Sequence, residues 1–108
     1  MSINYYGVPV RDAKRIGPIL ERTDTATLID EGKIRAALSR RFKGPERGTL
    51  KWEVGGDYVF VDVLPTHVIV THNTGRGSYQ IEVIMDAIEI LKKQGLHVWD
   101  PQQGKWFP

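Results

Sequence analysis

Cysteine is absent from this sequence, which excludes disulfide bonds, thiolate metal sites and a cysteine nucleophile. No apolar run approaches the ~20 residues that a membrane-spanning helix needs. Residues 1–7 have neither the basic start nor the apolar segment of a secretory signal. Together these absences predict a cytoplasmic protein that does not insert into a membrane.

Signatures of catalysis and cofactor binding are also missing. The sequence has no nucleophile elbow, no HExxH, no P-loop and no dinucleotide-binding fingerprint. His67 and His72 are five residues apart, so on one regular strand they point to opposite faces and cannot share a metal ion. His97 follows much later in the chain. We therefore expect surface or interfacial histidines, no metal, no cofactor and no enzymatic activity.

Alternating apolar residues indicate three strands between residues 49 and 72. Gly55 and Gly56 suit a two-residue hairpin turn, because glycine adopts positive φ without steric cost. That turn pairs Trp52 with Val59, and both belong to the apolar face.

A second tight turn, at residues 64–67, pairs Val63 with Val68 and completes the meander. One face of this sheet is then apolar throughout. The other face mixes charges with larger apolar side chains, namely Tyr58, Phe60 and Ile69.

A long helix is predicted over residues 78–94, with Gly95 as a left-handed terminator and Leu96 packing back on the helix. Its main apolar stripe consists of Ile81, Ile84, Met85, Ile88 and Leu91, and Val83, Ala87 and Ile90 widen it. An acidic side lies opposite the stripe and contains Glu82, Asp86 and Glu89.

Two shorter helices are predicted before the sheet. In residues 11–22 a helix either ends before Pro18 or begins there with Gly17 as its cap. Residues 27–43 form the second helix, for which Thr27 and Asp30 are both candidate caps.

The two ends of the chain add strands. Residues 3–10 are expected to form a strand or arm at an edge, because Pro9 cannot donate to a central ladder. Residues 98–107 are expected to form a strand and a turn that returns along it, and they contain Trp99 and Trp106.

These elements predict a single α+β domain over residues 1–108. Its length and its 41% hydrophobic content suffice for one core. We expect an antiparallel sheet, with the meander near 49–72 plus terminal strands, packed against a long C-terminal helix. The two shorter N-terminal helices complete the fold.

Aromatic side chains surrounded by charges are typical of protein-binding surfaces. Two surfaces are candidates. One is the mixed sheet face, provided that the N-terminal helices leave it open. The other, which we favour, combines the terminal aromatics with the acidic side of the long helix. The predicted partner-binding residues are Trp99, Trp106, Glu82, Asp86, Glu89, Tyr58 and Phe60.

Seven of the cations lie in residues 33–51, where Glu46 is the only acidic residue. Such a stretch can bind nucleic-acid phosphates. A small nucleic-acid-binding module is therefore the alternative function, and a small enzyme is the third. The residues of the alternative site are Arg40, Arg41, Lys43 and Arg47.

Residues 95–107, GLHVWDPQQGKWF, follow an amphipathic helix and resemble the ends of small bacterial immunity proteins. These belong to contact-dependent inhibition and other polymorphic toxin systems. The resemblance implies a cytoplasmic, non-enzymatic protein that binds and neutralises a cognate toxin domain. It carries over no binding residue, because such proteins share none.

Overall fold

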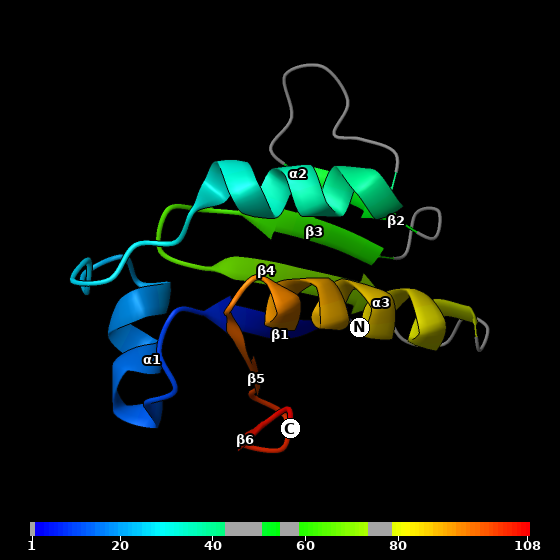
Figure 1. The fold of residues 1–108 in the computed structure, drawn as a ribbon. Helices are drawn as coiled ribbons and strands as arrows, with labels where there is room; N and C mark the ends of the chain where they lie inside the picture. Colours follow the sequence, from blue (N-terminus) through cyan, green and yellow to red (C-terminus); the bar gives the residue numbers. More distant parts are fainter. Residues whose placement is uncertain (1, 43–50, 55–58, 74–78) are drawn as a thin grey trace.

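The computed structural model describes residues 2–42, 51–54, 59–73 and 79–108 (Figure 1). The chain is an α+β domain with one antiparallel sheet and helices on it. Its elements are β1 (Ser2–Val8), α1 (Ala13–Leu20), α2 (Glu31–Arg41), β2 (Lys51–Val54), β3 (Val59–Val63), β4 (Val68–Asn73), α3 (Tyr79–Lys93), β5 (His97–Asp100) and β6 (Lys105–Trp106). No helix in these ranges is long and apolar enough to cross a bilayer.

The sheet has six strands in the order β2-β3-β4-β1-β5-β6, and every neighbouring pair is antiparallel. The first strand therefore lies inside the sheet, between β4 and β5, and its predicted edge position is wrong. Pro9 follows the last residue of β1, so its missing N–H does not interrupt the ladder.

Only one of the two strand pairs in the meander, β3 with β4, has the predicted register. Val63 pairs with Val68 as expected. Trp52, however, pairs with Val61 and not with Val59. Val59 pairs instead with Val54, a register that differs from the one predicted. Residues 55–58 and the Trp52 side chain lie outside the described part of the structure.

Helices α2 and α3 lie side by side over the same face of the sheet (Figure 1). This inner face and the two helices share one core. From α2 and α3 come Leu38, Ile88 and Leu91, each at most 1% exposed. The sheet contributes Val59, Val61, Val63, Val68 and Val70, all fully buried. Alternation of side chains along each strand places these five valines on one face.

The prediction of a long C-terminal helix is wrong. α3 has 15 residues, an ordinary helix length, and two strands follow it. It also shares the cover of the sheet with α2. Met85 is 41% exposed and does not belong to the buried stripe. Ala87 and Ile90, which were predicted to widen the stripe, do pack into the core on the side where α2 lies.

Some of the predicted capping residues do end or begin the helices in the structure. Gly95 ends α3 with a φ of +86°, as predicted, and the Leu96 N–H bonds to the Leu91 carbonyl at 3.1 Å. Asp30 caps α2 by accepting the Lys33 N–H at 3.1 Å. α2 ends at Arg41, before the predicted end at residue 43, because Phe42 adopts extended backbone and turns into the core.

α1 matches neither predicted alternative. Asp12 caps it by accepting the Lys14 N–H at 3.0 Å, and the helix continues through Pro18. A Cβ on the residue before a proline disfavours helical backbone, so Gly17 is what permits this path. α1 lies at the end of the sheet where β1 finishes (Figure 1), and Ile16 and Ile19 are buried there.

His67, in the turn before β4, is 2% exposed, so the prediction of a surface histidine is wrong at this position. Its Nδ1 lies 2.8 Å from the Thr66 hydroxyl, and its ring lies 6.4 Å from that of Tyr6. Burial lowers the pKa of the His67 imidazole below its ordinary 6.5, the charge of Arg22 lowers it further, and Asp62 opposes the shift. The folded protein therefore holds His67 neutral.

We expect the stability of the fold to decrease as the pH falls below about 6.5, where the unfolded chain binds a proton that folded His67 does not accept. Above that pH both states are neutral at this position and the effect vanishes. Urea unfolding of the wild type and His67→Gln at neutral and mildly acidic pH measures it. The free energy of unfolding of the wild type should fall more between the two pH values than that of His67→Gln. An identical pH dependence in both proteins would contradict this expectation.

Gly7 lies on the inner face of β1, where a Cβ would stand 3.1 Å from Leu91 Cδ1 and 3.3 Å from Leu96 Cδ1. We expect Gly7→Val to lower the free energy of unfolding by about 1–3 kcal/mol through overpacking. The matched control is Gly32→Ala in α2, where the nearest atom is an ordinary contact at 3.7 Å. That change should stabilise by about 0.5–1 kcal/mol. Chemical denaturation that shows no loss for Gly7→Val would disprove the close packing.

Candidate functional site

The face of the sheet opposite α2 and α3 carries a continuous row of side chains. Asp62, Ile69, Tyr6, Trp99 and Trp106 are direct cross-strand partners from β3 to β6. A second row beside it contains Phe60, Thr71 and Asn4. We call these eight residues the outer face. All eight are partly exposed.

The helices leave the outer face accessible over the described part of the chain. α2 and α3 pack on the inner face, and α1 lies at the end of the sheet (Figure 1). Val8, which is the partner of His97 at that end, is completely buried. The open area therefore begins at Tyr6 and extends across the strands to the terminal hairpin.

The terminal hairpin holds its two tryptophans in a fixed arrangement. The rings of Trp99 and Trp106 meet edge to face, with centroids 5.0 Å apart and planes at 67°. The Arg11 guanidinium lies 5.9 Å from the Trp106 ring, within the range of a cation–π contact. The turn is tight, because Asp100 accepts the Gln102 N–H at 3.0 Å and Gly104 has a φ of +63°.

The structure joins parts of the two predicted surfaces. Trp99 and Trp106 lie on the same face as Phe60 and Ile69, which the sequence analysis assigned to a separate candidate. Tyr58 lies outside the described residues. The outer face is therefore one aromatic surface that combines the mixed sheet face with the terminal aromatics.

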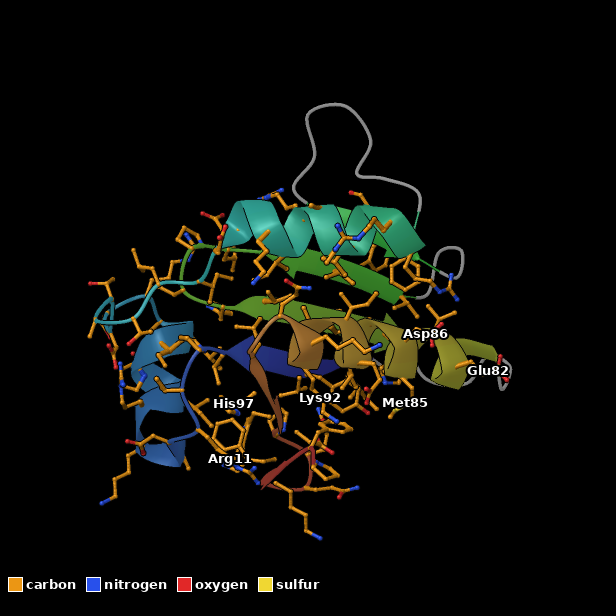
Figure 2. The ribbon with its side chains drawn as sticks, viewed as in Figure 1. Arg11, Glu82, Met85, Asp86, Lys92 and His97 are labelled. Atoms are coloured by element: carbon orange, nitrogen blue, oxygen red, sulfur yellow. The ribbon has the colours of Figure 1, made fainter. Side chains whose placement is uncertain are left out.

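The predicted acidic residues do not belong to this surface. Glu82, Asp86 and Glu89 lie on α3, in the helical layer on the other side of the sheet (Figure 2). Asp86 accepts two bonds from Arg41 of α2, at 2.6 Å from Nη2 and at 3.1 Å from Nε. Glu89 pairs with Lys92 at 3.1 Å. The predicted combination of aromatic and acidic residues is not formed.

The predicted nucleic-acid residues are only partly described. Arg40 and Arg41 line a groove of about 330 Å³ between α2 and α3, together with Asp86 and Glu89. The Arg41 guanidinium also lies 4.9 Å from the Phe42 ring. Lys43 and Arg47 lie outside the described residues. The groove thus carries charges of both signs, and Arg41 is neutralised by Asp86.

Tyr6, at the centre of the row, was missed by the sequence analysis. The reason is that residues 3–10 were placed at an edge of the sheet, where Tyr6 would have a neighbouring strand on one side only. The alternation of Ile3 and Tyr5 with Asn4 and Tyr6 was the available signal, since period-two alternation indicates two distinct faces. Within the described ranges, no group of three His, Asp or Glu residues is placed to hold a metal ion.

Comparison with known proteins assigns no family to the chain. No protein-family model matches the sequence, and comparisons with curated proteins and with solved structures find no match. The resemblance of residues 95–107 to immunity proteins stays a prediction.

Arg41 and Asp86 connect the two helices of the inner layer, and both side chains are about half exposed, at 54% and 46%. Because solvent screens such a pair, a double-mutant cycle with Arg41→Gln and Asp86→Asn should give a coupling energy of about 0.2–1 kcal/mol. Glu82→Gln removes a charge from the first turn of the same helix, where it interacts with the helix dipole. It is the control for loss of a single acidic charge and should lower stability by at most about 0.3–1 kcal/mol. A coupling energy well above that of a screened pair would mean that the ion pair determines how the helices dock.

Proposed function

We propose that this chain is a non-enzymatic cytoplasmic inhibitor that binds a cognate toxin domain through the outer face, as an immunity protein does. The observation that carries the proposal is the open row of Ile69, Tyr6, Trp99 and Trp106 across the sheet. The resemblance of the C-terminal residues to immunity proteins supports the kind of partner.

The composition of the outer face suits protein binding. Tyrosine and tryptophan are enriched among the residues that dominate binding energy, because they bury a large area at low entropic cost. Strands lie ~4.8 Å apart, so a row over five strands extends about 19 Å. That length is sufficient for the centre of an interface that buries about 800 Å² on each side.

The rigidity of this face also favours tight binding. Its side chains project from paired strands, and the two tryptophans hold each other at 5.0 Å. A surface that is already ordered loses little conformational entropy when a partner docks. An inhibitor of this kind needs no catalytic group, since it neutralises an enzyme by covering the surface through which the substrate enters.

The charge of the outer face indicates whether the partner's binding surface is apolar or charged. Asp62 is the only acidic residue among the eight, and Lys51 lies opposite it in β2. Binding is therefore expected to depend on apolar burial, and the acidic side of α3 takes no part. This differs from the sequence-based expectation that acidic residues steer a basic toxin.

The outer face can be tested with a candidate toxin domain, sought among the products of the genes next to that of this chain. Trp99→Ala and Phe60→Ala should each weaken binding by about 2 kcal/mol or more, roughly 30-fold, in isothermal titration calorimetry. Glu82→Ala, an exposed change on the helical layer, is the matched control and should retain full affinity.

Circular dichroism and thermal unfolding of each variant exclude a folding defect. If Glu82→Ala weakened binding while Trp99→Ala and Phe60→Ala did not, the helical layer would be the binding surface and the outer face would be wrong. If the toxin domain bound none of the proteins, the proposed function itself would fail.

A further inference from the structure

A pocket of about 210 Å³ lies beside the terminal hairpin, where the end of α3 meets β5. It is smaller than the ~300–1,000 Å³ of typical small-molecule pockets. It has room for one amino-acid side chain or one chain end. Its walls come from the segment before α1, the last turn of α3, β5 and the C-terminal residues.

Three basic side chains line this pocket, and no acidic side chain does so among the described residues. Arg11, Lys92 and His97 come from three separate segments and lie in the same region of the molecule (Figure 2). Two of these side chains lie close to the Trp106 ring. The Arg11 guanidinium is 5.9 Å from its centroid, and the centroid of the His97 ring is 6.3 Å from it. Lys92 has an exposed contact with Glu89, which a ligand can displace at small cost.

The end of α3 does not account for the charges of Arg11 and Lys92 at the pocket. Basic residues often neutralise the unpaired carbonyls of a last helical turn. Here the carbonyls of Ile90, Leu91 and Lys92 already accept N–H groups of residues 94–96 at 3.0–3.1 Å. The carbonyls of this last turn therefore do not explain why Arg11 and Lys92 gather at the pocket.

The rest of the pocket is apolar and firmly held. Leu96 is buried and belongs to the main core. The Phe107 N–H donates to the Val98 carbonyl at 2.8 Å, and its ring meets that of Tyr5 edge to face at 5.4 Å. The pocket thus offers a cationic rim above an apolar wall.

We propose that this pocket binds a carboxylate carried on a short apolar stem, with Arg11 as the main charged contact and Leu96 and Phe107 against the stem. The source of the carboxylate rests on the proposed function: it is an acidic side chain or the chain end of the bound protein. The pocket lies next to Trp106, so such a group would extend the outer-face interface around the edge of β5.

The test needs no partner, so its failure is distinguishable from failure of the proposed function. The Trp106 indole and the His97 ring are followed by NMR during titration of the isolated protein. N-acetyl-leucine should shift both signals with a millimolar dissociation constant, as expected for a ligand of this size. N-acetyl-leucinamide, which lacks the carboxylate, should not bind.

One further ligand separates the two sources of the carboxylate. N-acetyl-glutamic acid amide presents the carboxylate on a side chain, and N-acetyl-leucine presents it at a chain end. The ligand that binds more tightly identifies the preferred source. Acetate and inorganic phosphate, which lack an apolar stem, should bind more weakly. Equal binding of phosphate and N-acetyl-leucine would overturn the proposal.

Arg11→Gln should weaken N-acetyl-leucine binding about tenfold, because a hydrogen bond to a charged group is lost. Lys14→Gln removes a nearby exposed charge that does not line the pocket, and should leave the affinity unchanged. The absence of saturable shifts in the wild type, or an equal loss in both variants, would show that the pocket does not bind carboxylates.

Discussion

The packing of α2 and α3 on the same face of the sheet is the constraint on which the rest of the structure depends (Figure 1). The two helices bury the inner valines of β3 and β4 together with Leu38 and Leu91. Burial of apolar area is the main force that stabilises a domain of this size. Because α2 and α3 both lie on the inner face and α1 has only 8 residues, no long helix covers the outer face over the described chain. Its aromatic row therefore stays accessible.

This arrangement separates two kinds of surface. The helical layer carries charges of both signs, and its central pair, Arg41 and Asp86, connects the helices. The sheet presents Tyr6, Trp99 and Trp106 on the opposite side. A partner that contacts one surface cannot reach the other without passing an edge. The carboxylate pocket at Arg11 lies at such an edge and is the place where binding could continue beyond the sheet.

Local patterns predicted the elements better than their assembly. Val63 and Val68 were paired correctly because a tight turn fixes the register between them. Trp52 was paired wrongly because its register was inferred from a two-residue turn at the two glycines, whereas Val54 pairs with Val59. The predicted apolar face of β3 was unaffected by this error, since a shift by two residues preserves alternation. Which face the helices cover depends on contacts distant in sequence, so Met85 was wrongly assigned to the core.

The difference between the covered and the open face of the sheet can be tested by NMR with a soluble paramagnetic agent. The agent should broaden the side-chain signals of Phe60, Ile69 and Trp99, which lie on the outer face. It should leave those of Val61, Val70 and Leu38 sharp, because these side chains are fully buried. If the outer-face signals were as protected as the valines, the sheet would be covered on both sides and the account would be contradicted.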